Sequence, residues 1–263
     1  MSEVPLPASR YKEWSELADP TNRPGAREPL FAYRESMLRF RLRPESSALV
    51  LVDLQYGSAG PDHGYAKVYR GIGYGELHDA YIERVRTTVV PAVQRLQQAF
   101  RAVGAPVIFL TVGTIVGDLS DMPPRFRRGA EHWLGLGLEP PYARTGTREM
   151  TVLDEIAPLP GEPVIVKTSA SGFTASPLER VLRGRGVREI AFCGVSTTYC
   201  VESTLRDAAD RGFDVVLVED GCADSTPEIH ARGLASCGAF GRVANADAVI
   251  SEIRAAAPVL VAR

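Results

Sequence analysis

Short, continuous runs of apolar residues recur along the chain, and the segments between them are either helical in period or rich in glycine. The first run, 47–53, ends on a carboxylate. A run of about four to eight apolar residues without polar alternation is typical of a parallel strand buried on both faces. Similar runs lie at 106–112, 163–167, 190–193, 213–218 and around Val243. The pattern therefore predicts about six strands.

Several of the intervening segments carry apolar residues at helical spacing. The longest, 76–103, predicts a crossover helix in which Pro91 is able to introduce a kink. A Ser-Pro pair and a Thr-Pro pair predict two helix starts, since proline favours the first helical position after a capping hydroxyl. Further helices are predicted at 176–183, 199–212, 226–239 and 246–256.

Strands that alternate with helices over short connections imply right-handed crossovers. We therefore predict an α/β fold of three α/β/α layers, with a mostly parallel, doubly wound sheet of about six strands. Two long segments interrupt the alternation: 54–75 is rich in Gly and Tyr, and 113–150 mixes Gly, Pro, Arg and aromatic residues. Both are predicted to be loops at the carboxyl edge of the sheet, where binding residues or lids commonly lie.

Residues 1–46 are rich in Pro, Arg and Glu, with scattered aromatic residues and no sustained periodicity. We interpret them as an extended arm that lies against its own domain or a neighbouring subunit, because aromatic residues argue against pure disorder. A homo-oligomer is therefore expected. Residues 47–263 are predicted to form a single domain.

Composition excludes several classes of protein. With 45% hydrophobic and 24% charged residues over 263 positions and a net charge of -2, the chain is typical of a globular protein with a full core. Neither a nucleic-acid nor a membrane partner is indicated, and no leader or membrane span is found, so a cytoplasmic location is expected. Cys193, Cys200, Cys222 and Cys237 lack metal-ligand spacing and are expected to be free thiols.

Cys200 is the first candidate for chemistry. It lies in the first turn of a predicted helix, after an apolar run and a Ser/Thr-rich turn at 194–199. Free backbone N–H groups and the positive end of the helix dipole favour a thiolate at such a position. The alternative is a small core residue, as most free cysteines are.

Asp53 and Lys167 end two other predicted strands. Each has an ordinary alternative, since the aspartate could cap a turn and the lysine could be a solvated charge. Because the carboxyl ends of parallel strands meet at one edge, we expect both residues near Cys200. A nucleophile, a base and a cation together are typical of an active site.

Each residue type fits one chemical task. A thiol has an ordinary pKa of about 8.5, so we expect Lys167 and the helix N-terminus to lower the pKa of Cys200. Asp53 is able to accept the thiol proton and return it to a leaving nitrogen. The backbone N–H groups of Ser196, Thr197 and Cys200 are candidates for an oxyanion hole, in which one donor lowers the barrier by about 3 kcal/mol.

Four segments carry these residues in an order and spacing that resemble the isochorismatase-like superfamily of cysteine hydrolases. They are Leu-Val-Asp-Leu-Gln at 51–55, Lys-Thr-Ser-Ala-Ser-Gly-Phe at 167–173, Gly-Val-Ser-Thr-Thr-Tyr-Cys-Val-Glu-Ser at 194–203 and Val-Glu-Asp-Gly-Cys-Ala at 218–223. The resemblance covers residues 47 to about 245. It implies that 47–263 is an isochorismatase-like hydrolase domain.

The resemblance also implies roles for individual residues. Cys200 would be the nucleophile, Asp53 the general base and Lys167 the stabilising cation, with a cis peptide bond between Val195 and Ser196. Isochorismatases proper cleave a vinyl ether without a cysteine, so Cys200 favours hydrolysis of a C–N bond. Nicotinamidases carry an Asp and two His metal ligands that have no counterpart after Asp53 or in 111–117. We therefore expect no metal and no other cofactor.

With these two activities disfavoured, the sequence resembles the amidohydrolases of N-carbamoylsarcosine, biuret, triuret and ureidoacrylate. Some of these enzymes have an N-terminal arm and form tetramers. The predicted activity is cysteine-dependent cleavage of a small ureide or N-carbamoyl amide, with ammonia release through a covalent cysteinyl intermediate. The expected partners are this small molecule and further copies of the chain, as a dimer or tetramer. Two alternatives stay open: a nicotinamidase-like amidase of another small amide, and a non-catalytic binding protein of the same fold.

Substrate-binding candidates are less sharply defined. Arg125 and Arg128 lie in the second long segment, where they could meet a carboxylate or a planar ureide or could simply be solvated. The remaining candidates are Gln55, Tyr56, Phe173 and Tyr199. The histidines His78, His132 and His230 lack ligand spacing and are expected to be surface or packing residues.

Overall fold

The computed structural model describes residues 37–142 and 144–256. The chain divides into two units, 1–39 and 40–263, and the second contains the sheet. Most of the predicted arm lies outside the described residues. Its last seven residues belong to the second unit, where Leu42 is fully buried and its N–H donates to Glu252 Oε1 at 2.9 Å.

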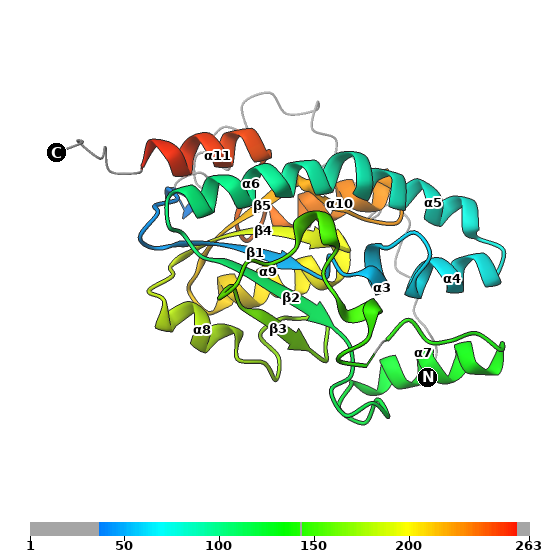
Figure 1. Cartoon of the computed structure of the whole chain (residues 1–263). Helices are drawn as coiled ribbons and strands as arrows, with labels where there is room; N and C mark the ends of the chain where they lie inside the picture. Colours follow the sequence, from blue (N-terminus) through cyan, green and yellow to red (C-terminus); the bar gives the residue numbers. More distant parts are fainter. Residues whose placement is uncertain (1–36, 143, 257–263) are drawn as a thin grey trace, which may run out of the picture. The chain divides into compact units, whose positions relative to one another are not determined.

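Six strands form one sheet in which every pairing is parallel, in the order β3-β2-β1-β4-β5-β6 (Figure 1). The sheet order reverses direction between β1 and β4, so a crevice is expected beyond the carboxyl ends of these two strands. The strands are β1 (Ser47–Val52), β2 (Val107–Val112), β3 (Val164–Lys167), β4 (Glu189–Val195), β5 (Asp214–Ala223) and β6 (Arg242–Ala244). The predicted fold class is confirmed.

Strand β1 shows why the apolar runs are continuous. All six of its residues are buried, because β2 and β4 flank it and helices cover both faces. Leu49 and Leu51 pack into one core cluster, whereas Val50 and Val52 pack into the other. Successive side chains of a strand point to opposite faces, so both sets of positions must be apolar here.

The helices form a layer on each face of the sheet (Figure 1). One core cluster joins the sheet to α5 (Gly75–Arg84), the π-helical turn η1 (Val85–Val89), α6 (Val90–Ala102) and α11 (Ala246–Ala255). The other joins it to α8 (Leu178–Gly184), α9 (Glu202–Asp210) and α10 (Pro227–Cys237). This arrangement is the predicted three-layer architecture.

The long crossover helix forms as predicted, with a local change of winding instead of a break. The π-helical turn η1 ends immediately before α6, and Pro91 occupies the first turn of α6. Proline has no N–H to donate to the preceding turn, and a wide turn is one of the ways in which a helix accommodates it.

The two long segments are not the loops that the sequence predicts. Residues 54–75 contain α3 (Tyr56–Ala59) and α4 (Gly64–Gly71), and 113–150 contains α7 (Pro124–Gly135) and the 3₁₀ turn η2 (Arg148–Met150), which is followed by a second such turn, η3 (Asp154–Ile156). At Gly64, φ is +42° and an added Cβ would lie 2.1 Å from the Gly57 oxygen. Glycine here permits close contact between two helices.

Two proline pairs open helices, but only one does so as predicted. Thr226 Oγ1 accepts a hydrogen bond from Ile229 N–H at 3.3 Å and caps α10. Helix α8 begins at Leu178, so Pro177 occupies the N-cap position that the sequence assigns to Ser176. Ser176 Oγ still accepts from the first helical N–H, at 3.1 Å.

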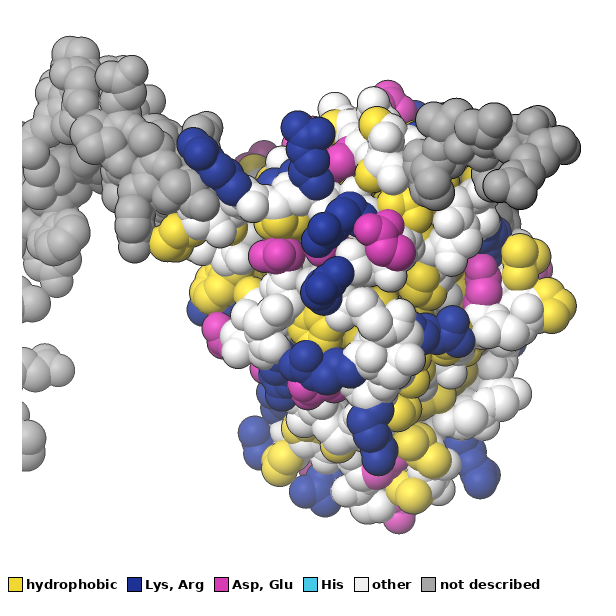
Figure 2. Space-filling model, turned by 90° about the vertical axis from the view of Figure 1, so that its left-hand side faces the viewer, with side chains coloured by type: hydrophobic (Ala, Val, Ile, Leu, Met, Phe, Trp, Pro, Cys, Tyr) yellow, Lys and Arg dark blue, Asp and Glu magenta, His cyan; other side chains and the backbone are white. Residues whose placement is uncertain are grey.

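Charges of both signs are mixed on the surface. On the face shown in Figure 2, Lys and Arg side chains lie among Asp and Glu side chains. Elsewhere in the described part of the chain, opposite charges pair, as in Arg101 with Glu162 at 2.7 Å and Arg242 with Glu252 at 2.6 Å. No helix in the described part of the chain is long and apolar enough to cross a membrane.

Candidate active site

Three strand ends bring Asp53, Lys167 and Cys200 together, as the sequence predicts. Lys167 Nζ lies 2.8 Å from Asp53 Oδ2, and the two side chains are only 0% and 2% exposed. Strand β2 lies between the strands that carry these residues, so the lysine side chain reaches past its end. Nζ also donates to the Ser169 carbonyl at 2.9 Å. The Cys200 thiol interacts with both charged groups.

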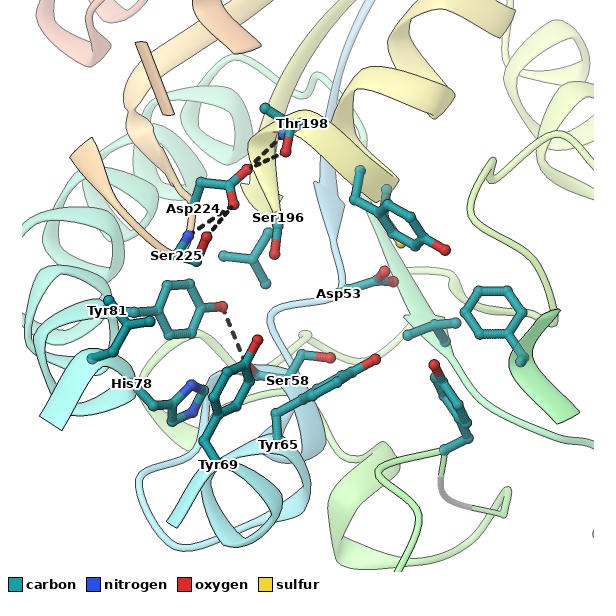
Figure 3. A pocket seen from close by; sticks show the side chains of 17 residues that line it. Asp53, Ser58, Tyr65, Tyr69, His78, Tyr81, Ser196, Thr198, Asp224 and Ser225 are labelled. Carbon is teal, nitrogen blue, oxygen red and sulfur yellow. Dashed lines mark hydrogen bonds between the residues drawn. The ribbon is translucent and has the colours of Figure 1, made fainter. Parts of the chain in front are cut away.

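The backbone of Asp53 is unusual. Its φ is +54°, a left-handed conformation that aspartate tolerates better than most residues. Its N–H donates to the Leu110 carbonyl of β2 at 2.9 Å, and its carboxylate faces the cavity (Figure 3). No donor in the described part of the chain is aligned for a hydrogen bond to either carboxylate oxygen, so the lysine contact is an ion pair. The carboxylate is able to accept a proton.

Burial dominates the titration of this site. It raises the pKa of the Cys200 thiol to about 12, although the Lys167 ammonium acts in the opposite direction. Burial likewise raises the pKa of Asp53 against the effect of Lys167. Burial disfavours the Lys167 ammonium, but Asp53 and Cys200 outweigh it and raise its pKa. The resting site therefore holds an ion pair and a neutral thiol.

The expected lowering of the thiol pKa is thus wrong for the resting protein. The sequence identified the two groups that favour a thiolate, but Cys200 is only 6% exposed. Removing water from around an ion disfavours the charged form more than one cation compensates. The thiol must therefore lose its proton to a base during the reaction.

A tight turn carries Cys200 from β4 into its helix. The peptide bond between Val195 and Ser196 is cis, and the π-helical turn η4 (Thr197–Val201) precedes α9. Gly194 has a φ of +135°, and an added Cβ would lie 2.0 Å from the Val52 oxygen. Only glycine permits β4 to pass β1 this closely. Neither the Ser196 N–H nor the Thr197 N–H donates to an oxygen of the described residues.

A chain of hydrogen bonds holds this turn from behind. Thr197 Oγ1 lies 3.0 Å from the Ala223 carbonyl and 2.8 Å from His230 Nδ1, and His230 Nε2 lies 3.0 Å from Arg84 Nη2. A guanidinium only donates, so Nε2 accepts and Nδ1 carries the proton. Thr197 Oγ1 therefore accepts from His230 and donates to Ala223. Burial and then the charge of Arg84 lower the pKa of His230, which favours this neutral form.

A second set of bonds holds the same turn through Asp224. Its Oδ2 accepts from the Thr198 N–H and hydroxyl, both at 2.7 Å. Its Oδ1 accepts from the Ser225 N–H at 2.8 Å and from the Ser225 hydroxyl at 3.3 Å. Asp224 directly follows β5, which places it at the same edge of the sheet as Asp53. The turn is thus fixed by a histidine and a carboxylate that the sequence did not single out.

A cavity of about 310 Å³ opens in front of these groups (Figure 3). Cys200 and Asp53 lie on its wall, together with Ser196 from the turn. Aromatic side chains from α4, α5 and α7 make up much of the remainder. The other lining residues are Ser58, Tyr65, Tyr69, Leu77, His78, Tyr81, Val112, Phe126, Tyr142, Val195, Thr198, Tyr199, Asp224 and Ser225.

Of the predicted substrate-binding residues, Tyr199 lines the cavity and the arginines do not. Arg125 Nε donates to the Tyr199 hydroxyl at 2.9 Å, and its guanidinium stacks 4.8 Å from the centre of the Phe126 ring. Arg125 therefore contacts a residue of the cavity wall, Tyr199, without lining the cavity itself. Arg128 is exposed on α7 and is not among the lining residues.

Gln55, Tyr56 and Phe173 have structural contacts and do not line the cavity. The Gln55 amide donates to the Val112 carbonyl at 2.9 Å and accepts from its N–H at 2.6 Å, which ties the end of β1 to β2. Arg148 covers the Tyr56 ring at 3.8 Å. Phe173 lies in the core against Phe213.

Apart from Tyr199, the sequence did not identify the tyrosines that line the cavity. For Tyr65 and Tyr69 a signal was present as the tyrosine-rich composition of 54–75, but which rings face the site depends on α4, which was not predicted. His78, expected to be a surface or packing residue, is buried and stacks on Tyr69 with ring centres 4.9 Å apart, and it also lines the cavity. Burial lowers the pKa of His78 to about 4.

No three His, Cys, Asp or Glu side chains within 37–142 and 144–256 are arranged to hold a metal ion.

The sequence matches the isochorismatase domain over residues 47–248. The chain belongs to the isochorismatase family. Among curated members of that family, ureidoacrylate amidohydrolase RutB of Stutzerimonas stutzeri is 31% identical over 257 residues, which cover 93% of each chain. RutB of Azorhizobium caulinodans is 29% identical over 194 residues, 70% of this chain and 79% of that one.

Solved structures of isochorismatase-family proteins share the fold. A cysteine hydrolase from Pseudomonas syringae superimposes with a TM-score of 0.67 at 25% identity, covering 83% of this chain and 97% of that one. N-carbamoylsarcosine amidase from Thermoplasma acidophilum gives a TM-score of 0.54 at 24% identity, covering 77% and 97%. The second likeness supports the architecture alone.

Proposed function

We propose that the protein is a cysteine-dependent amidohydrolase that cleaves a C–N bond of a small ureide or N-carbamoyl amide and releases ammonia. The observation that carries this proposal is the buried contact of Lys167 with Asp53, which lines the same cavity as Cys200. Family membership and the two amidohydrolase relatives make the chain a hydrolase of C–N bonds. The substrate and the cysteinyl route are the proposed parts.

In the first half of the reaction, Cys200 Sγ attacks the substrate carbonyl carbon. Because burial keeps the thiol neutral, its proton passes to the Asp53 carboxylate as the S–C bond forms. The carbonyl oxygen gains negative charge and accepts hydrogen bonds from the backbone N–H groups of Ser196, Thr197 and Cys200. The C–N bond then breaks, and the nitrogen takes the proton from Asp53 and leaves as ammonia.

In the second half, water attacks the thioester carbonyl. Asp53 takes a proton from this water, the S–C bond breaks, and Cys200 recovers its proton as the acid product leaves. In the resting site Lys167 is positively charged, since the neighbouring anion outweighs its burial. Its charge keeps Asp53 ionised and ready to accept a proton in a site that would otherwise favour the neutral acid.

Ammonia release from a panel of amides tests the proposal. The panel contains biuret, triuret, N-carbamoylsarcosine, ureidoacrylate and nicotinamide. We expect turnover of at least one ureide, abolished in Cys200→Ala and retained in Cys237→Ala, whose thiol lies in the core away from the cavity. A trapped thioester, seen by mass spectrometry as an adduct on Cys200, would identify the intermediate.

Three outcomes would change the conclusion. Turnover that survives Cys200→Ala would overturn the nucleophile. Turnover of nicotinamide alone would favour the nicotinamidase-like alternative. If no compound were cleaved and iodoacetamide modified Cys200 no faster than Cys237, a non-catalytic binding protein would be the better description.

A further inference from the structure

The charged groups around the cavity disfavour a substrate with a negative charge. None of the seventeen described lining residues is Lys or Arg, while two of them, Asp53 and Asp224, are carboxylates. The charge of Asp53 is paired with Lys167. Asp224 is held by hydroxyl and backbone N–H groups instead of a cation. A carboxylate on the substrate would thus enter a site with a second carboxylate, Asp224, and with no cation among its described lining residues.

The guanidinium of Arg125 contacts two rings of the cavity wall but does not itself line the cavity. Its Nε is occupied by the Tyr199 hydroxyl, and it stacks on the Phe126 ring. Both rings line the cavity, whereas Arg125 does not. An anion would have to displace these contacts to meet it.

The remainder of the wall is aromatic and suits a flat group. Tyr65 and Tyr142 meet edge to face with ring centres 6.2 Å apart, and Phe126 meets Tyr142 in the same way at 4.8 Å. Figure 3 shows Tyr65 and Tyr69 across the cavity from Asp224 and Ser225. Aromatic walls of this kind bind planar apolar groups, and a few hydroxyls fix their orientation.

We propose, on the basis of the amidohydrolase function above, that the substrate is an uncharged ureide or amide with a flat apolar substituent. The relatives named for ureidoacrylate act on a carboxylate, so this chain would differ from them in substrate charge. For an aryl urea, Cys200 forms an S–C bond to the urea carbon and ammonia leaves. Water then attacks this thiocarbamate, the S–C bond breaks to restore the thiol, and the N-arylcarbamate that is released decomposes to an arylamine and carbon dioxide.

Three aryl ureas test the proposal in the full-length protein. Phenylurea is uncharged, and 4-nitrophenylurea and 4-ureidobenzoate have nearly the same shape but differ in charge. We expect kcat/KM for ammonia release to be higher for 4-nitrophenylurea than for 4-ureidobenzoate by about tenfold or more, since a buried charge without a partner is strongly disfavoured. Protection of Cys200 from iodoacetamide by each compound gives the same ranking without turnover.

The results separate this inference from the proposed function. Preference for 4-ureidobenzoate in either assay would overturn the uncharged substrate and leave the amidohydrolase intact. The absence of both turnover and protection for all three ureas would also overturn the inference, while biuret turnover would still support the function. Failure of the whole amide panel, with an unreactive Cys200, would overturn the function itself.

A positive charge introduced into the cavity wall should reverse part of the preference for an uncharged substrate. Leu77 lines the cavity from α5 and is 41% exposed, so a longer side chain is accommodated there. Leu77→Arg is expected to shift the kcat/KM ratio toward 4-ureidobenzoate by about two- to fivefold, the effect of a partly solvated ion pair. Leu77→Gln is the uncharged control, and an equal shift in both variants would contradict the electrostatic explanation.

Discussion

The buried ion pair of Lys167 and Asp53 affects both the proposed reaction and the stability of the fold. Both groups are removed from water, so each charge depends on the other. We predict that Lys167→Met lowers the free energy of unfolding by about 3–5 kcal/mol, because it leaves a buried carboxylate without its cation. Urea unfolding followed by circular dichroism measures this loss.

The double variant Asp53→Asn with Lys167→Met is the matched control. It removes both charges, so it should regain much of the stability lost in Lys167→Met but none of the activity. If the double variant were as unstable as the single one, the contribution of Lys167 would be packing and not charge.

The pH dependence of activity follows from the titrations of Asp53 and Cys200. Asp53 must be ionised to take the thiol proton, and its pKa is raised by burial. We therefore predict that kcat/KM falls on acidification at a pH above the ordinary aspartate pKa of about 3.9. Since the Cys200 pKa is about 12, no thiol limb is expected between pH 7 and about 10. A limb near the ordinary thiol pKa would contradict the neutral resting state.

The hydrogen bonds that join Arg84, His230 and Thr197 lead to a prediction for the turn that carries Cys200 from β4 into α9. We expect His230→Phe to lower kcat by about tenfold with little change in KM, because the proposed role of the Thr197 N–H is to donate to the oxyanion that develops in the transition state. His230→Asn should retain most of kcat, since its amide is able to donate to Thr197 Oγ1 in place of Nδ1. The control is His132→Phe, an exposed histidine on α7. Equal losses in the Phe and Asn variants would indicate a packing role only.

The strands were predictable from sequence because a strand buried on both faces has a local signature. The proximity of Asp53, Lys167 and Cys200 was predictable for a related reason, since they end or follow those strands and parallel strands share one carboxyl edge. Helices α3 and α4 were missed because glycine marks both irregular loops and close helix contacts, and only the contact of Gly64 with Gly57 distinguishes them. The directions of Gln55 and Phe173 depend on packing that no local pattern contains.

The direction of the Cys200 pKa illustrates a further limit. The charges and the helix end near it can be read from spacing, but the extent of its burial is a property of the folded layers. The same holds for the cavity, whose wall combines α3, α4, α5 and α7 with the ends of four strands. Substrate-binding residues are therefore harder to predict than catalytic ones.

At the scale of the whole molecule, the core extends into the predicted arm. Leu42 is fully buried, and Glu189 accepts from Ser46 Oγ at 2.6 Å and pairs with Arg43 at 3.2 Å. We predict that a chain of residues 47–263 is less stable than one of residues 40–263 by about 2 kcal/mol or more, because it loses a core leucine and leaves a buried glutamate short of partners. Equal thermal midpoints would contradict this.

We further propose that the chain forms a homo-oligomer, a dimer or tetramer, in which the arm contacts a neighbouring subunit. The aromatic residues of the arm support this proposal. Sedimentation of the full-length protein and of residues 40–263 tests it: the full chain should sediment as the oligomer and the shorter one as a folded monomer. If both chains sedimented as the same oligomer, the interface between subunits would lie outside the arm.

The position of the proposed catalytic residues, at or after the ends of β1, β3 and β4, has a consequence for how the protein folds. Residues 53, 167 and 200 belong to three separate crossover units, so no contiguous fragment shorter than most of the sheet contains all of them. During refolding, local helices form early and the distant parallel pairings form late. Enzymatic activity should therefore return after helical content does, and it would report completion of the four neighbouring strands from β3 to β4.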